Sequence, residues 1–227
     1  MVDTTIILDP AHGKDTPGKR SPDGRLEEWK WSRDRIAAIF LKLDQEAKGF
    51  DVAIPLMGFS NEPGLHYRVD SYNQYRLQYK TVIVLSLHVD AFGTGKIWMD
   101  PNGFTIFTSR GETDADDYAT IIGQALKRQL PEERWRFDFG LSRNEMVRDL
   151  DREANFTILA GYKRPDGTWQ NPKYHGILIE NNFMTNRHDV KKLLDPEWNE
   201  KLEEAYVKAI LYLAAKLGKA PDYNLTI

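Results

Sequence analysis

The stretch TVIVLSL at residues 81–87, followed by His88, is almost continuously apolar and rich in β-branched side chains. A short apolar run of this kind is typical of a strand whose two faces are both buried. Such strands belong mainly to parallel sheets, because the helices that connect parallel strands cover both faces of the sheet. Residues 81–87 are therefore expected to form a central strand, with His88 directly after it.

The segments on either side alternate between strand patterns and helix patterns. Strands are expected over residues 4–8, 50–54, 103–108 and 176–179, and helices over residues 26–48, 66–80, 115–129 and 196–217. This alternation predicts a single α/β domain over residues 1–227, with a mostly parallel central sheet flanked by helices. Residues 131–174 show no clean period and contain Pro165-Asp166-Gly167, which indicates loops or an inserted hairpin.

Composition narrows the classes of function. The chain carries 34 acidic and 31 basic side chains, a formal charge of −3, which disfavours nucleic acid and anionic lipid as partners. It has no cysteine, so any bound metal would need His, Asp or Glu ligands. The N-terminus, MVDTTIILDP, has no basic region and only a short apolar stretch. We therefore expect neither a secretory signal nor insertion into a membrane.

Polar side chains with catalytic potential follow the predicted strands. His12, His88 and Glu180 each come at or just after the carboxyl end of a strand. In α/β domains ligands bind outside this edge of the sheet, so the three side chains should lie near one another. Glu28 lies in the first turn of the helix that follows the first strand.

Two imidazoles and one carboxylate are a common ligand set for catalytic zinc, because three protein ligands leave a fourth position for water or substrate. His12, Glu28 and His88 would supply such a set, but their separations in sequence match no short metal motif. From the residues alone, each histidine is better explained as a residue that hydrogen-bonds the backbone near a strand end. Glu180 is either a strand cap or a general base beside a metal.

Four separated stretches carry a family resemblance: DPAHG at residues 9–13, SPDGRLEEW at 21–29, SLHVDA at 86–91 and ILIENNFMTN at 177–186. In this order they resemble the zinc-dependent N-acetylmuramoyl-L-alanine amidases of the amidase 3 family. The motifs of that family are similar to Asp-Pro-Gly-His-Gly, a glutamate that opens a long helix, Ser-x-His-x-Asn and Glu-x-x-Phe-x-x-Asn. Three positions depart from these patterns, namely Ala11, Lys14 and Asp90, and none of them removes a candidate ligand.

The resemblance implies an enzyme that hydrolyses the bond between N-acetylmuramic acid and L-alanine in peptidoglycan. His12, Glu28 and His88 would bind one zinc ion per chain, and Glu180 would be the catalytic glutamate that serves as general base and then as proton donor. Glu27 competes with Glu28 for the ligand position. The apolar helical residue Ile36 follows Glu28 at a spacing similar to that of the family, which favours Glu28.

Two other functions stay open at this stage. One is a zinc peptidase that cuts a different amide of the cell wall, and the other is an inactive module that binds peptidoglycan. A chain without a signal sequence resembles the phage lysins, which are made in the host cytoplasm before they reach the cell wall. We expect the protein to be a monomer.

Further residues have two interpretations each. His175 precedes the last predicted strand and is a candidate for a supporting role at the site. Tryptophans are candidates for glycan stacking or for the core: Trp29, Trp31, Trp98, Trp135 and Trp169. Three arginines are candidates for binding stem-peptide carboxylates or for ordinary surface ion pairs: Arg143, Arg148 and Arg152.

Overall fold

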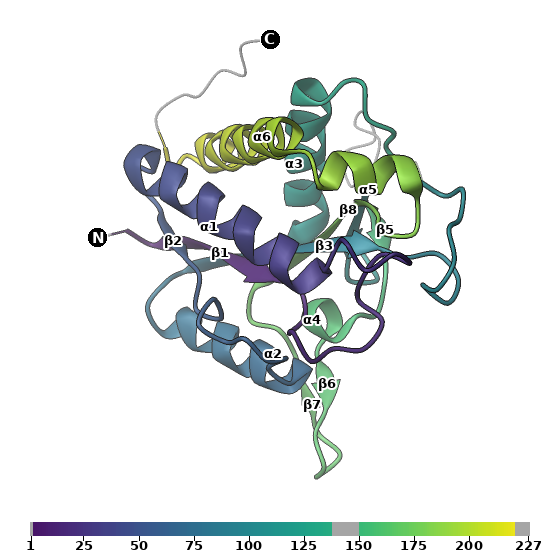
Figure 1. Ribbon diagram of the computed structural model, residues 1–227. Helices are drawn as coiled ribbons and strands as arrows, with labels where there is room; N and C mark the ends of the chain where they lie inside the picture. The colour runs from purple at the N-terminus through teal and green to yellow at the C-terminus, as the bar shows by residue number, and fades with distance from the viewer. Residues whose placement is uncertain (1, 138–149, 221–227) are drawn as a thin grey trace.

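A computed structural model describes residues 2–137 and 150–220, which form a six-stranded sheet with helices on both faces (Figure 1). The strands, in the order β2-β1-β3-β8-β4-β5, are Asp51–Ala53, Thr4–Pro10, Thr81–Asp90, His175–Phe183, Thr105–Thr108 and Arg152–Glu153. β2, β1, β3 and β8 run parallel, and β4 pairs antiparallel with β8. The predicted α/β class with a mostly parallel sheet is therefore confirmed.

The helices cover the two faces of the sheet unequally. Four of them lie on one face: α1 (Glu28–Glu46), α3 (Asp114–Gln129), α5 (Arg187–Leu193) and α6 (Pro196–Lys216). The other face carries α2 (Leu65–Asn73), the 3-10 helix Gln74–Leu77 and the short α4 (Thr157–Ala160). Among the described residues, no helix is long and apolar enough to cross a membrane.

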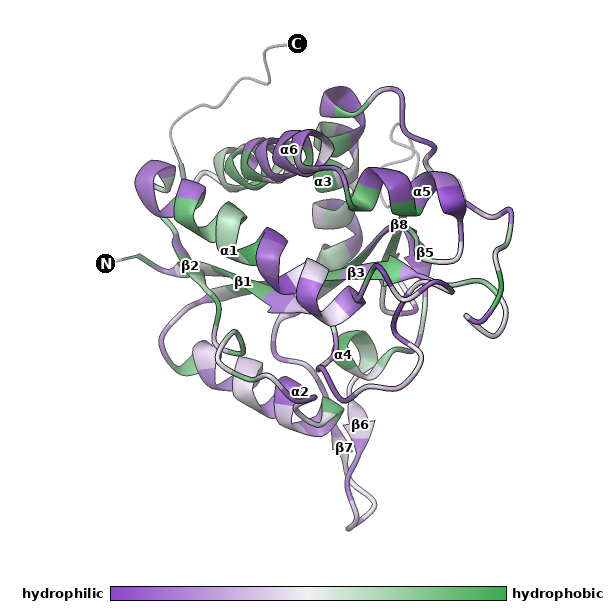
Figure 2. Cartoon of the chain, viewed as in Figure 1, coloured by the Kyte–Doolittle hydropathy of each residue, from purple (hydrophilic) through white to green (hydrophobic). Residues whose placement is uncertain are grey.

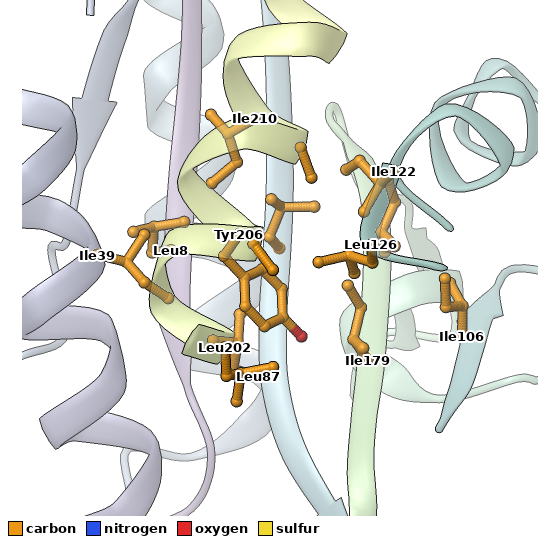
Figure 3. Packing of buried hydrophobic residues seen from close by; sticks show 14 of the residues in the cluster. Leu8, Ile39, Leu87, Ile106, Ile122, Leu126, Ile179, Leu202, Tyr206 and Ile210 are labelled. Atoms are coloured by element: carbon orange, nitrogen blue, oxygen red, sulfur yellow. The ribbon is translucent and has the colours of Figure 1, made fainter. Parts of the chain in front are cut away.

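The sequence pattern of β3 is explained by burial on both faces. Residues 82–87 are all buried, and their side chains alternate between two apolar clusters. Ile83, Leu85 and Leu87 pack toward α1, α3 and α6 in the larger cluster, whose centre is shown in Figure 3. Val82 and Val84 pack toward α2 and α4 in the smaller one. A strand between two helical layers has no face on which polar residues can alternate.

The strands that carry the candidate residues extend further than their apolar runs. β3 continues to Asp90 and β8 to Phe183, so that His88 and Glu180 lie inside strands and face each other in register. The prediction that these strands end at or before the two residues was therefore wrong. Hydrogen bonding between the strand backbones continues beyond the apolar residues, where the side chains face the site and not the core. A pattern of apolar side chains does not reveal this extension.

Two smaller elements complete the fold. Around the predicted turn at residues 165–167, β6 (Tyr162–Lys163) and β7 (Trp169–Gln170) form a hairpin, which confirms the expected insertion. Figure 2 shows this hairpin as mostly hydrophilic and the adjoining α4 as hydrophobic. Helix α5 was not expected from the sequence. The side chain of Asn186 begins it by accepting hydrogen bonds from the backbone N–H groups of His188 and Asp189.

A buried polar contact joins helix α6 to the bulge at which β3 and β8 shift register. Asn181 donates hydrogen bonds to the main-chain carbonyls of His88 and Ile179, both at 3.0 Å. Tyr206 of α6 donates its hydroxyl to the side-chain oxygen of Asn181 at 2.6 Å. Burial raises the pKa of Tyr206, so this hydroxyl stays a donor.

Tyr206→Phe should therefore destabilise the protein by about 1–3 kcal/mol, because it leaves the buried Asn181 oxygen without its donor. Chemical denaturation followed by circular dichroism measures the change. Tyr212→Phe on the same helix is the matched control, since Tyr212 is partly exposed and its ring lies beneath Lys216. Equal losses in the two variants would contradict the role given to the contact.

Candidate metal centre and active site

Three side chains from three elements converge at the carboxyl edge of the sheet. His12 lies in the loop after β1, Glu28 is the first residue of α1, and His88 lies near the end of β3. One potential ligand atom from each lies within 4.8 Å of the others. Nδ1 of His88 is 3.0 Å from one Glu28 oxygen, and Nε2 of His12 is 3.6 Å from the other. This is the arrangement that a cation with N, N and O ligands needs.

Glu28 is held as an anion between the two imidazoles. Its side chain is 1% exposed, and one of its oxygens also accepts a hydrogen bond from the backbone N–H of Val89 at 3.0 Å. Burial opposes ionisation of Glu28, but the hydrogen-bonding contact with His88 and the proximity of His12 outweigh it and lower its pKa. The second Glu28 oxygen and Nε2 of His12 are buried without a hydrogen-bond partner. Two orphaned buried atoms that point at each other fit a bound cation.

Glu27 does not share this position. It precedes the first helical residue, is partly exposed, and lies 3.9 Å from Arg20. The structure thus brings Glu28, and not Glu27, to the two histidines.

The backbone around the centre is locally constrained. His12 has φ of 47°, a left-handed conformation that residues other than glycine rarely adopt and that recurs at functional sites. At Gly13 an added Cβ would lie 1.9 Å from the backbone nitrogen of Glu62, so only glycine fits there. Ser32 of α1 accepts a hydrogen bond from the N–H of Ala11 and donates one to the carbonyl of Leu87. It thereby joins the helix that begins at Glu28 to the strands beside both histidines.

Glu180 lies on β8 directly opposite His88. One of its oxygens is buried without a hydrogen-bond partner. Burial raises the pKa of Glu180 well above its usual range, and the charges of Glu28 and Asp90 act in the same direction. A carboxyl group in this state is suited to proton transfer.

A cavity of about 350 Å³ opens onto these groups. His12, His88, Glu180 and Lys19 contribute polar groups to its lining. Its apolar lining is formed by Leu65, Phe156, Ile158 and Leu178. An apolar lining with a few convergent polar groups is the usual form of a substrate pocket.

Other candidates from the sequence lie elsewhere. His175 pairs with Ile83 at the far end of β8 from Glu180 and contacts the ring of Tyr118, so the structure does not bring it to the site. Trp31 is buried, and Trp169 on the hairpin is 54% exposed. Trp29, Trp98 and Trp135 are partly buried. Arg152 begins β5, whereas Arg143 and Arg148 lie outside the described residues.

The comparison with protein families decides the assignment. A family model described as N-acetylmuramoyl-L-alanine amidase, that of amidase 3, matches residues 6–212. The chain belongs to this family. The resemblance drawn from the four sequence stretches is thereby confirmed, and the protein is a hydrolase of the N-acetylmuramoyl-L-alanine amidase kind.

Solved structures of other amidases have a fold similar to that of this chain. The N-acetylmuramoyl-L-alanine amidase from Clostridium difficile 630 gives a TM-score of 0.73 at 20% identity, covering 95% of this chain and 100% of that chain. The amidase AmiC2 of Nostoc punctiforme gives 0.67 at 18% identity, with 94% and 98% covered. The catalytic domain of CwlV from Bacillus (Paenibacillus) polymyxa var. colistinus gives 0.68 at 15% identity, with 95% and 99% covered. None of the curated proteins compared with the amidase matches its sequence.

Sequence reasoning overlooked one group of buried or half-buried polar residues beside the histidines of the amidase. These are Asp9, Glu62, Arg68 and Ser86, which also line the cavity. Asp9 and Ser86 open two of the four stretches that carry the family resemblance, but the resemblance assigned them no role. Glu62 and Arg68 stand in a polar loop and helix outside those stretches, where no periodicity or motif marks them.

A paired substitution tests which glutamate binds the metal. Glu28→Gln should lose bound metal and activity, with a fall in affinity beyond the roughly 10- to 100-fold cost of removing an outer-shell partner. Glu27→Gln should keep both. Metal content by mass spectrometry after dialysis distinguishes them, and loss of metal in the Glu27 variant alone would mean that the helix register was misassigned.

Proposed function

We propose that this amidase uses one zinc ion, held by His12, Glu28 and His88, to hydrolyse the amide bond between N-acetylmuramic acid and L-alanine in peptidoglycan, with Glu180 moving the protons. Family membership supports the bond and the substrate. One observation carries the assignment of residues: the three ligand atoms lie within 4.8 Å of one another, and two of the three residues, His12 and His88, line a cavity that Glu180 also lines.

The donor set fits zinc. Two imidazole nitrogens and a carboxylate oxygen are typical ligands of a catalytic zinc site, and the sequence has no cysteine that would indicate a structural one. Glu28 supplies negative charge, and both it and His12 hold a buried atom without a protein partner. Zinc at such a site acts as a Lewis acid toward water and toward a carbonyl oxygen.

Glu180 supplies the proton chemistry. Its carboxyl group, with a pKa raised above the usual range, can take a proton from the attacking water and pass it to the nitrogen of the leaving L-alanine. No serine nucleophile is needed. Ser86 in the cavity wall is fully buried and donates its hydroxyl proton to Asp9, so it is not poised for attack.

The apolar lining places the rest of the substrate. Phe156 and Leu65 are 41% and 52% exposed and line the same cavity as the polar groups. An apolar surface there excludes water from the reacting bond and strengthens the electrostatic effects of the polar groups.

Replacement of Glu180 separates proton transfer from metal binding. Glu180→Gln should lower the rate of hydrolysis by about 10²- to 10⁴-fold, as expected for loss of a general acid–base group. Its zinc content should equal that of the parent protein. Glu200→Gln, exposed on α6, is the control variant. A Glu180 variant with unimpaired turnover would exclude the role.

The products identify the bond. Digestion of purified peptidoglycan should release stem peptides with new L-alanine amino termini and leave the glycan strands uncut. A strong chelator should stop the reaction, and added zinc should restore it, because the metal is lost from the site. Mass spectrometry of the soluble fragments checks both points; new reducing sugar ends, or lysis that continues after verified removal of metal, would contradict the proposal.

A further inference from the structure

Each histidine of the centre has a second ring nitrogen that faces away from Glu28. Nδ1 of His12 lies 3.4 Å from a carboxylate oxygen of Glu62. Nε2 of His88 lies 3.1 Å from the hydroxyl oxygen of Ser86. The two rings therefore present opposite nitrogens to the centre, Nε2 in His12 and Nδ1 in His88.

The two partners belong to one hydrogen-bonded network. Arg68 donates to Glu62 from Nη2 at 2.9 Å and from Nε at 3.2 Å. Through Nη1 the same guanidinium bonds Asp9, and Asp9 accepts the hydroxyl proton of Ser86. Arg68 is 3% exposed and Asp9 1%, so the middle of the network is closed to solvent.

Hydrogen bonds between two loops fix the position of Glu62. The backbone N–H of Glu62 donates to the side chain of Asp15 at 2.6 Å, and Thr16 donates to the Glu62 carboxylate at 2.9 Å. The N–H of Lys14 bonds the carbonyl of Ser60 at 2.8 Å. Close contact at Gly13 fixes the same two segments against each other. These contacts hold the carboxylate of Glu62 beside the ring of His12.

The carboxylates of the network share one buried cation. Arg68 bonds both Glu62 and Asp9, and these two raise the pKa of Arg68 against the effect of burial. Glu62 therefore presents to His12 a carboxylate that Arg68 holds in place.

We propose that Glu62 is a positioning residue and that the chain Glu62–Arg68–Asp9–Ser86 selects the tautomers of both histidines for metal binding. An anionic acceptor at Nδ1 of His12 keeps the proton there and leaves the lone pair of Nε2 for the metal. Ser86 uses its hydroxyl hydrogen in the bond to Asp9, so its oxygen is placed to accept from Nε2–H of His88, which leaves the lone pair of Nδ1 free.

This inference rests on the proposed metal centre, and it assigns Glu62 no ligand position. Glu62 meets the ring nitrogen of His12 that faces away from Glu28, outside the group of three converging ligand atoms.

Metal affinity is the first test. Glu62→Ala removes the acceptor and Glu62→Gln removes only its charge; Glu132→Gln, in an exposed ion pair with Lys201, is the matched control. Competition with a chromophoric chelator should show zinc bound about 10- to 100-fold more weakly by Glu62→Ala, less weakened in Glu62→Gln, and unchanged in the control. Unfolding of the metal-free proteins verifies that all are folded.

The outcomes separate this inference from the proposed function. A parent protein that binds no zinc would refute the metal centre itself. A parent that binds one zinc ion tightly, together with Glu62 variants of unchanged affinity, would overturn only the role of Glu62.

Nuclear magnetic resonance of ¹⁵N-histidine in the zinc-loaded protein tests the tautomers directly. His12 should carry its proton on Nδ1 and His88 on Nε2. In Glu62→Ala the signals of His12 should shift and broaden while those of His88 stay, and in Ser86→Ala the reverse should hold. The same tautomer at both histidines would overturn the inference.

Discussion

β3 is paired in parallel with β1 on one side and with β8 on the other, and the register is unbroken as far as His88. Because parallel strands end at a common edge, this pairing brings the loop of His12, the end of β3 and Glu180 together. Glu28 comes from α1, and Ser32, one turn along the same helix, bonds the backbone at Ala11 and Leu87 and so holds the helix beside both histidines. A slip of one residue in β3 would turn His88 into the apolar cluster and remove it from the site.

Several carboxylates are buried at the site, and the contacts within the protein only partly compensate for their loss of hydration. The charge of Glu28 helps to raise the pKa of Glu180, and each of the two keeps a buried oxygen without a protein partner. Arg68 compensates Asp9 and Glu62, which lie on the far side of the histidines. Buried ion pairs of this kind add little net stability, because the loss of hydration rivals the attraction. Their value here is orientation, which apolar residues of the same size could not supply.

What the sequence predicts well is what a single segment determines. β3 is recognisable because both of its faces are buried. The choice of Glu28 over Glu27, in contrast, rested on the family resemblance, in which an apolar helical residue such as Ile36 follows the glutamate. The ends of β3 and β8 are not recognisable, since their last residues serve the site and lack the apolar pattern. Helix α5 has only seven residues, too few to show a period. Glu62 becomes meaningful only when two loops meet, and no local pattern encodes that contact.

The two faces of the sheet divide stability and function between them. α1, α3 and α6 bury the larger apolar cluster, which includes the side chains that fill the space around Tyr206. On the other face, α2 and the four-residue α4 bury a smaller cluster, and the cavity opens between α4 and the polar groups of the strands. Residues 155–158 of the cavity wall are thus carried by an element that adds little to the main core. Changes there can reshape the pocket while the sheet that positions the histidines and Glu180 stays in place, because the two rest on different packing.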